Sequence, residues 1–325
     1  MRISRRRRYG LILAASAIAI GGIAAGCGDD DDDSSNGGED LSGSITIDGS
    51  STVAPLSEAA AEQFQAENSG VRVTVGTSGT GGGFEKFCRG ETDISDASRS
   101  IKDEEIQACA DAGITYEEIT VGNDGLSVAV NLENDWAQCL TVEQLNAIWG
   151  PDSKVNNWNQ VDPSFPDEEL VLFGPGTDSG TFDFFTEAIN GEEGAQRTDY
   201  NNVGEDDNQA VTGVEGNVGG MAYFGFSFIQ ENEDKVRAVE VDSGNGCVAP
   251  STETVQAGEY TPLGRGLFIY PSGEALQRPE VQGFARFYIE NNDAIAEQAL
   301  AIPLSDDQRE QANAQIDTLV SGGGE

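Results

Sequence analysis

Apolar and polar residues follow two different periods along the chain. Segments 43–49 (GSITIDG) and 71–79 (VRVTVGTSG) alternate apolar and polar side chains, which predicts a strand in each. Between them, segment 51–68 spaces apolar residues three and four apart after a serine, a threonine and an early proline. This predicts a helix that begins with a hydroxyl N-cap.

Strand-like and helix-like spacings of apolar residues continue to alternate as far as the C-terminus. Further strands are predicted at 92–95, 114–122, 125–132, 169–174 and 267–271, and helices at 81–90, 102–113, 141–148, 181–190, 279–291 and 305–320. Four aromatic residues, Tyr223, Phe224, Phe226 and Phe228, predict a strand-like core cluster. The alternation indicates an α/β fold with a largely parallel sheet flanked by helices. Two α/β domains joined by a crossover fit the chain length.

The N-terminus has the pattern of an exported lipoprotein. In residues 1–26 a run of arginines precedes an uncharged apolar stretch that ends in AAGC, which resembles a lipobox. We therefore expect a signal peptide at 1–26 and lipidation of Cys27. A signal-anchor helix is the alternative, but the glycine-broken stretch is short for a bilayer core of about 30 Å. Both the general and the twin-arginine export routes remain open.

Residues 27–42, rich in Asp, Gly and Ser, predict an acidic flexible tether.

Net charge and the absence of histidine restrict the function. The formal charge of −39 disfavours nucleic acid and anionic lipid as partners. It does not decide the charge of a buried ligand, because distant carboxylates are screened over a Debye length of about 8 Å. With no histidine in the chain, Ser/His/Asp and Cys/His catalysis and imidazole metal ligation are excluded. We expect no cofactor and no metal site.

Four cysteines follow Cys27, which in an exported chain predicts two disulfides. Three pairings are possible. We favour Cys88 with Cys109 and Cys139 with Cys247, because each pair then lies within one of the two expected domains.

Three segments share an order of apolar strand, glycine with serine or threonine, and helix. They are 48–53 (DGSSTV), 76–84 (GTSGTGGGF) and 174–182 (GPGTDSGTF). Unpaired N–H groups and the positive end of the helix dipole attract anions at such turns, and hydroxyls add donors without charge. One turn of this kind is weak evidence, since hydroxyl caps are common, but three together predict one anion site.

At these turns the chain resembles the phosphate-binding protein of the phosphate-specific ABC transporter. The resemblance covers almost everything from residue 43 onward and is most discriminating at DSGTF. It implies a two-lobed class II periplasmic-binding-protein-like α/β fold with the ligand in the interdomain cleft. Lobe I would comprise 43–121 and 262–325, and lobe II 122–261. The residues carried over as phosphate-binding are Ser51, Thr52, the Val53 amide, Ser78, Thr80, Ser179, Gly180 and Thr181.

Two departures from the family pattern concern charge. Many members place an arginine before the third turn, where this chain has Pro175. Many also place an aspartate after the 92–95 strand, where this chain has Ser98 and Arg99. We interpret Arg99 as the replacement cation for phosphate, assisted by Ser98, since its forked donors suit phosphate oxygens. The alternative is a surface ion pair of Arg99 with Asp93, Asp96 or Asp103.

The carboxylate that would accept a ligand proton, and so reject sulfate, is a separate question. Asp96 and Asp178 are the candidates, and Asp178 is also a candidate helix N-cap.

These observations predict a monomeric, non-enzymatic receptor, exported and lipid-anchored at the outer face of the cytoplasmic membrane. It would capture inorganic phosphate and deliver it to the permease of an ABC importer. The alternatives are a receptor for sulfate or molybdate, a surface phosphate-binding protein without a transport role, and a phosphatase with Ser179 as nucleophile. The last lacks a histidine base and the flanking glycines of a nucleophile elbow.

Overall fold

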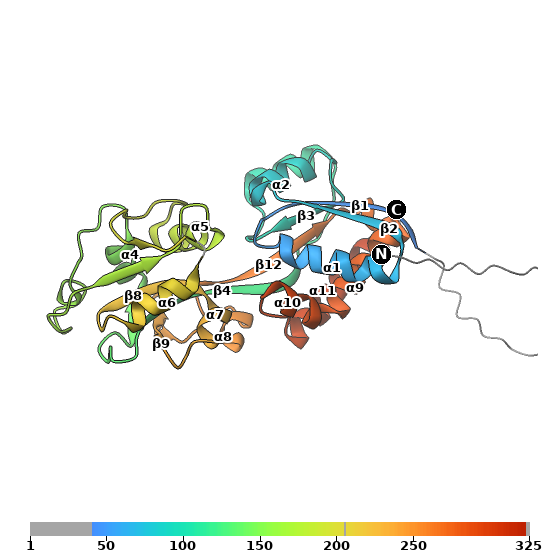
Figure 1. The fold of residues 1–325 in the computed structure, drawn as a ribbon. Helices are drawn as coiled ribbons and strands as arrows, with labels where there is room; N and C mark the ends of the chain where they lie inside the picture. Colours follow the sequence, from blue (N-terminus) through green and yellow to red (C-terminus); the bar gives the residue numbers. More distant parts are fainter. Residues whose placement is uncertain (1–40, 205, 323–325) are drawn as a thin grey trace, which may run out of the picture. The chain divides into compact units, whose positions relative to one another are not determined.

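The computed structural model of the protein describes residues 41–204 and 206–322. The predicted signal peptide, Cys27 and the tether as far as residue 40 lie outside these ranges. A nine-stranded sheet forms the centre, with the order β2-β1-β3-β12-β4-β8-β6-β7 and β9 paired to β4 (Figure 1). Among the described residues no helix combines the length and apolar character needed to cross a membrane.

The first core lies on the strands at one end of this sheet. Parallel pairing joins β1 (Ser42–Gly49) to β2 (Gly70–Gly76) and to β3 (Ile94–Ala97). The helices of this part are α1 (Ala54–Glu67), α2 (Gly79–Phe87), α3 (Asp103–Asp111), α9 (Pro279–Glu290), α10 (Asn292–Ala299) and α11 (Asp306–Gly322). Apolar side chains of β1, α1 and α9, such as Ile45, Phe64 and Phe284, are buried together.

Two long strands connect this core with a second one. β4 (Ile119–Asn131) and β12 (Gly264–Pro271) pair antiparallel, with a register shift after Leu267. β4 is continuous where two separate strands were predicted, because its central polar residues have partners. Asn123 pairs through its backbone with Ile302, and Asp124 bonds to an arginine of β12.

The second core contains the remaining strands of the large sheet and a small three-stranded sheet. The strands are β6 (Val171–Gly174), β7 (Asn201–Asn202), β8 (Gly220–Gly225), β9 (Val236–Ala238), β5 (Cys139–Thr141), β10 (Glu240–Asp242) and β11 (Cys247–Val248). The α-helices are α4 (Val142–Trp149), α5 (Gly180–Phe185), α6 (Asp207–Glu215), α7 (Phe226–Gln230) and α8 (Thr252–Gln256). Aromatic residues fill this core, with the rings of Phe185 and Tyr223 stacked 3.7 Å apart.

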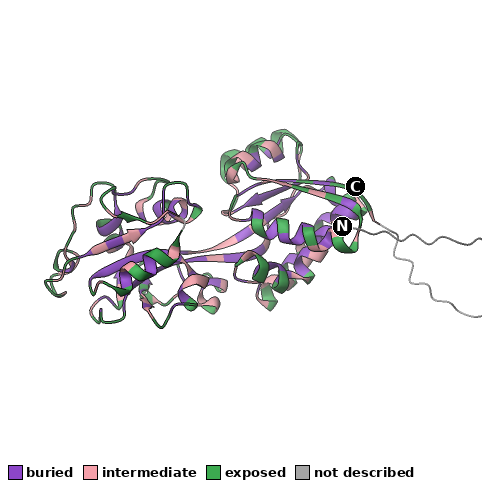
Figure 2. Ribbon diagram, in the orientation of Figure 1, coloured by how far each residue is buried: buried purple, intermediate pink, exposed green. Residues whose placement is uncertain are grey.

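Burial follows the sheet. Figure 2 shows the central strands of the large sheet, such as β3, β4 and β8, mostly as buried, while β2 at one end and the outer faces of the helices carry exposed residues. The buried apolar residues form three clusters. One is drawn mainly from residues 45–121 and 267–319, one mainly from 126–263, and a smaller one contains Phe84, Phe87 and Tyr270 beside Cys88 and Cys109.

Several sequence-based predictions were wrong in detail. The sheet is mixed rather than largely parallel, because β12 and β4 run antiparallel to their neighbours. The predicted helix at 181–190 divides into α5 and a π-helix, Thr186–Asn190. The aromatic cluster is not one strand, since Phe226 and Phe228 belong to α7.

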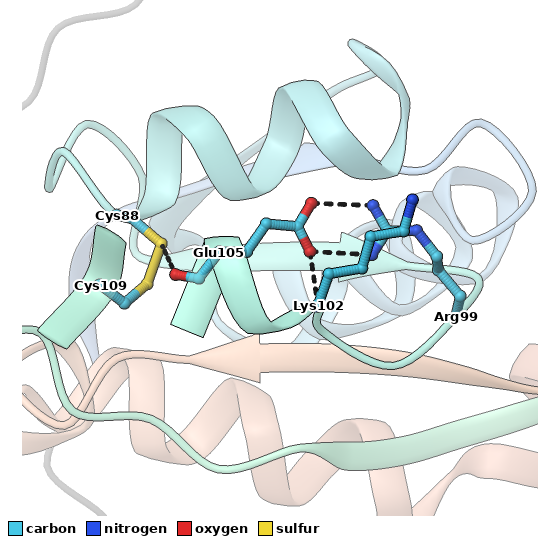
Figure 3. Close-up of a disulfide and its surroundings, with 5 residues drawn as sticks. All are labelled: Cys88, Arg99, Lys102, Glu105 and Cys109. Atoms are coloured by element: carbon cyan, nitrogen blue, oxygen red, sulfur yellow. Dashed lines mark hydrogen bonds and ion pairs between the residues drawn. A yellow bond between two sulfur atoms is a disulfide. The ribbon is translucent and has the colours of Figure 1, made fainter. Parts of the chain in front are cut away.

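Both favoured disulfides are confirmed. Cys88–Cys109 joins the end of α2 to α3, and Cys139–Cys247 joins β5 to β11 (Figure 3 shows the first). Each bond therefore stays within one of the two core regions.

Candidate anion-binding site

The three turns follow the carboxyl ends of β1, β2 and β6 and lead into α1, α2 and α5. In the first turn, Gly49 has φ +151°, and a Cβ there would lie 2.0 Å from the Asp96 carbonyl oxygen. The Ser50 N–H donates to that carbonyl at 2.9 Å, and the Ser50 hydroxyl accepts the Thr52 N–H at 3.2 Å. The predicted hydroxyl cap of α1 is wrong, because Val53 is the N-cap and no side chain bonds there.

The second turn joins β2 to α2 through Ser78 and Gly79, whose φ is +79°. The hydroxyls of Thr80 and Ser98 lie 3.2 Å apart, and the Ser98 N–H donates to Thr80 at the same distance. Because Ser98 directly follows β3, the second turn is fixed to the end of β3, which lies on the other side of β1 from β2.

Ser179 is the N-cap of α5 in the third turn. Asp178 was the candidate for this position, so that prediction was wrong. The Ser179 N–H donates to the Gly176 carbonyl at 3.2 Å, and only 4% of the residue is exposed. The Ser179 hydroxyl makes no capping bond.

The three turns border two adjoining cavities. Ser51, Thr52, Gly180 and Arg265 line both of them. The first cavity is also lined by Ser78, Thr80, Ser98 and Arg99, and the second by Asp178, Ser179 and Thr181. Of the residues predicted from sequence to contact the ligand, Val53 and the candidate proton acceptor Asp96 line neither cavity, and both side chains are buried.

Arg99 lines the first cavity but already has an anionic partner. Its guanidinium makes two hydrogen bonds of 2.8 Å to the Glu105 carboxylate (Figure 3). The side-chain hydrogen bond to Glu105 raises the pKa of Arg99. The alternative prediction, an ion pair of Arg99, is therefore confirmed, but the partner is Glu105 and not one of the three aspartates that were named. Glu105 is placed here because it also accepts the Lys102 N–H at the start of α3.

Sequence reasoning missed two cations of the first cavity, Lys102 and Arg265, of which only Arg265 also lines the second. Its guanidinium bonds to Asp124 at 3.0 Å and to the Thr52 hydroxyl at 3.3 Å. It also lies 3.6 Å from the ring centroid of Phe184 on α5. The predicted strand began at Leu267, two residues after Arg265. Arg265 and Asp124 are direct cross-strand partners in the β12–β4 register, so pairing these strands would have located them.

The two candidate proton acceptors are placed differently. Asp178 is exposed and lines the second cavity. Asp96 lines neither cavity, because its side chain is fully buried and accepts the Ser57 hydroxyl at 2.9 Å. Burial raises the pKa of Asp96 to about 7, despite the lowering effect of Ser57.

Acidic residues also line the first cavity, on the side of α5. They are Asp183, Glu187 and Glu193. Burial, with a contribution from Glu193, raises the pKa of Asp183. An anion entering here would need Arg99, Arg265 and the hydroxyl and N–H donors to outweigh these carboxylates.

A larger cavity, of about 490 Å³, lies beside the start of β3 between Arg89 and Arg278. It shares no residue with the three turns. Both arginines have acidic partners there, Glu91 for Arg89 and Asp93 for Arg278. Arg99 and Arg265 are paired with carboxylates too, so the cations do not decide between the cavities. The three glycine–hydroxyl turns that lead into helices favour the two smaller cavities as the anion site.

Comparison with known proteins decides the family. The model of the PBP superfamily domain matches residues 34–292. The phosphate-binding protein PstS of Staphylococcus saprophyticus is 38% identical over 313 residues, which cover 95% of this chain and 94% of that protein. The chain belongs to the PstS family of the PBP superfamily.

Two further relatives are more similar to this chain in sequence than the Staphylococcus protein is. Protein SphX of Synechococcus elongatus is 47% identical over 263 residues, covering 80% of this chain and 77% of SphX. The crystal structure of a possible phosphate-binding protein from Planctomyces limnophilus is 43% identical, with a TM-score of 0.80, and covers 86% of this chain and 99% of that one. The PstS family consists of solute-binding proteins rather than enzymes, and the fold is its two-lobed α/β fold.

Proposed function

We propose that this protein is an extracytoplasmic receptor that captures inorganic phosphate and delivers it to an ABC phosphate importer. The observation that carries the proposal is the meeting of three glycine–hydroxyl turns and two arginines at adjoining cavities. The names of the PstS relative and of the Planctomyces structure, both of which refer to phosphate binding, give independent support.

The ligand would be bound mainly by neutral donors. The predicted ligands are the hydroxyls of Ser51, Thr52, Thr80, Ser98, Ser179 and Thr181, the hydroxyl oxygen of Ser78, and backbone N–H groups at Val53 and Gly180. Such fixed donors replace the hydration shell of an oxyanion without a matching number of charges. Arg265 from β12 and Arg99 each supply positive charge in part, because Asp124 and Glu105 already pair with their guanidinium groups.

The two cores would act as the two lobes of the receptor. We place lobe I at 43–121 and 262–325 and lobe II at 122–261, with β4 and β12 as the connection. Ser51 and Thr52 come from the first region, and Ser179 to Thr181 from the second, so bound phosphate would favour lobe closure. The closed form is the one we expect the permease to recognise.

Anchoring and assembly complete the proposal. We infer that Cys27 becomes lipidated after removal of residues 1–26, holding a monomeric receptor at the outer face of the cytoplasmic membrane. The AAGC sequence and the acidic tether at 27–42 support this inference. Mass spectrometry of the N-terminal peptide from membranes tests it, since an unmodified Cys27 would contradict lipidation.

We also propose that the protein is not an enzyme. The chain has no histidine to activate Ser179, and the Ser179 side chain makes no hydrogen bond to any described residue that would act as a base. Hydrolysis of a chromogenic phosphate ester, abolished by Ser179→Ala, would overturn this part of the proposal.

Calorimetric titration of the ligand-stripped protein with phosphate tests the function. We expect one site per chain, and Thr52→Val should weaken binding at least tenfold, because it removes a hydroxyl shared by both cavities. Thr318→Val is the matched control, since the Thr318 hydroxyl bonds to the Ala314 carbonyl on α11, away from the cavities. No heat of binding with phosphate at micromolar protein would contradict the proposal.

A further inference from the structure

The first cavity has two walls of opposite charge. Its cations belong to the region proposed as lobe I, and its carboxylates, those of Asp183, Glu187 and Glu193, to the region proposed as lobe II. Beside the hydrogen bond to Glu105, the charge of Glu187 contributes to raising the pKa of Arg99, so the two walls face each other. Inorganic phosphate is attracted by the first wall and repelled by the second, so it leaves the acidic wall without a role.

The three carboxylates have no cation of their own. Across 41–204 and 206–322, no side chain forms an ion pair or a hydrogen bond with any of them. Burial and the charge of Glu193 accordingly raise the pKa of Asp183. A shared metal ion does not explain the cluster, because these carboxylate oxygens do not all lie within 4.8 Å of one another. A more extended cationic group fits their spacing better.

A third cavity, of about 360 Å³, adjoins the first and shares Arg99, Arg265 and Glu187 with it. Much of its lining is apolar and comes from Phe184, Ala188, Pro262 and Phe268. The first cavity is itself about 360 Å³. Small organic ligands occupy cavities of about 300–1,000 Å³, so the space beside the three turns is large enough for a phosphoryl group with an organic substituent.

The Ser179 hydroxyl indicates where the phosphoryl group would lie. Ser179 is 4% exposed and lines the second cavity, and its hydroxyl has no hydrogen-bond partner in the described part of the chain. A buried polar group without a partner is costly, so an oxygen of the ligand would complete this site. Arg265 lines all three cavities. A phosphoryl group held between Ser179 and Arg265 would therefore direct its substituent into the first and third cavities.

We infer that the site also binds phosphonates and phosphate monoesters whose short substituent carries an ammonium group. This inference rests on the proposed phosphate-binding function. The phosphoryl group would take the position of inorganic phosphate, and the methylene carbons would pack against Phe184 and Phe268. The ammonium would lie beside Asp183, Glu187 and Glu193. The two charges of the ligand then match the two walls of the first cavity.

The first test compares two phosphonates that differ in the ammonium. Ligand-stripped protein is titrated calorimetrically with 2-aminoethylphosphonate and with ethylphosphonate at pH 8.5, where an alkylammonium remains protonated. We expect the amino compound to bind at least tenfold more tightly. Affinities within twofold of each other would overturn the inference. Phosphoethanolamine, the monoester with the same ammonium, separates the two ligand sources: tighter binding than that of 2-aminoethylphosphonate assigns monoesters, and weaker binding assigns phosphonates.

The second test removes part of the acidic wall. Asp183→Asn combined with Glu187→Gln should weaken 2-aminoethylphosphonate binding at least fivefold and strengthen phosphate binding at least twofold, because negative charge is lost beside an anion. Neither side chain makes a hydrogen bond to another described residue, so the variant should fold. Glu215→Gln combined with Glu231→Gln is the matched control. It removes two exposed carboxylates outside the three cavities and should leave both affinities within twofold.

The opposite signs distinguish ligand contact from a structural role. If the carboxylates served only to attract the basic wall and hold the two regions together, the double variant would weaken both ligands, and that result overturns the inference. Phosphate binding without any binding of 2-aminoethylphosphonate or phosphoethanolamine also overturns it and leaves the proposed function intact. Failure of the unmodified protein to bind phosphate contradicts the proposed function instead.

Discussion

Arg265 stacks on Phe184, with 3.6 Å between the guanidinium carbon and the ring centroid. Arg265 belongs to β12, one of the two connecting strands, and Phe184 to α5, which follows the third turn. The same guanidinium bonds to Thr52 in the first turn and to Asp124 on β4. One side chain of β12 thus contacts the first turn, the helix that follows the third turn and the other connecting strand.

Replacement of Arg265 by methionine should weaken phosphate binding more than tenfold, a loss of about 1.4 kcal/mol or more. The physical reason is the loss of a forked cation that lines both cavities. Arg265→Lys is the matched control. Its phosphate affinity should lie between those of the unmodified protein and the methionine variant, because lysine keeps the charge but loses the forked donors and the planar stacking. Calorimetric affinities within twofold of each other for all three proteins would remove Arg265 from the site.

Arg99 and Glu105 should have opposite effects on phosphate affinity. Arg99→Ala is expected to weaken binding more than tenfold, about 1.4 kcal/mol or more, if the guanidinium reaches the ligand. Glu105→Gln should strengthen binding, because it removes the carboxylate that holds both ends of the Arg99 fork. Titration of the two variants side by side checks this. A change within twofold in Arg99→Ala would mean that Arg99 serves only to fix the start of α3.

Asp96 should make stability depend on pH. Its pKa is about 7 in the folded protein, raised by burial from the ordinary value of 3.8. Between these two values the folded protein binds more protons than the unfolded chain, so this residue makes stability fall as pH rises from about 4 to about 7. Above pH 7 its contribution is constant.

Asp96→Asn removes this titration. Between pH 5 and pH 8 the unmodified protein should lose about 1 kcal/mol or more of unfolding free energy relative to the variant, as measured by urea unfolding. Parallel pH profiles for the two proteins would show that Asp96 titrates normally.

The two disulfides should contribute unequally to stability. Cys139–Cys247 closes a sequence separation of 108 residues and Cys88–Cys109 one of 21. In the chain-entropy model, removal of these bonds costs roughly 5 and 3 kcal/mol respectively. Urea unfolding of the two paired Cys→Ser variants measures the difference, and a larger loss for the Cys88–Cys109 pair would contradict the model.

The order of strands and helices was predictable from sequence, because the spacing of apolar residues that distinguishes them can be read within each short segment. The α1 segment and β1 were located within a few residues. The mixed character of the sheet was not predictable in this way, since it depends on the return of β12, more than 130 residues later, between β3 and β4.

In the candidate site, too, some residues were predictable from local sequence and others were not. Ser78, Thr80 and Ser179 are recognisable because glycine and hydroxyl residues adjoin one another in the chain. Arg265 is flanked by glycines in a strand and has no such local signal; only its register with Asp124 places it at the first turn. The partner of Arg99 depended on the helix start at Lys102, where Glu105 folds back to cap the backbone.

The most direct test of the central claim is a crystal structure of the protein grown with phosphate. We predict phosphate density where the two cavities adjoin, within hydrogen-bonding distance of Thr52, Arg265 and the Ser179–Thr181 turn. Phosphate found instead in the larger cavity between Arg89 and Arg278, with the three turns empty, would contradict the account.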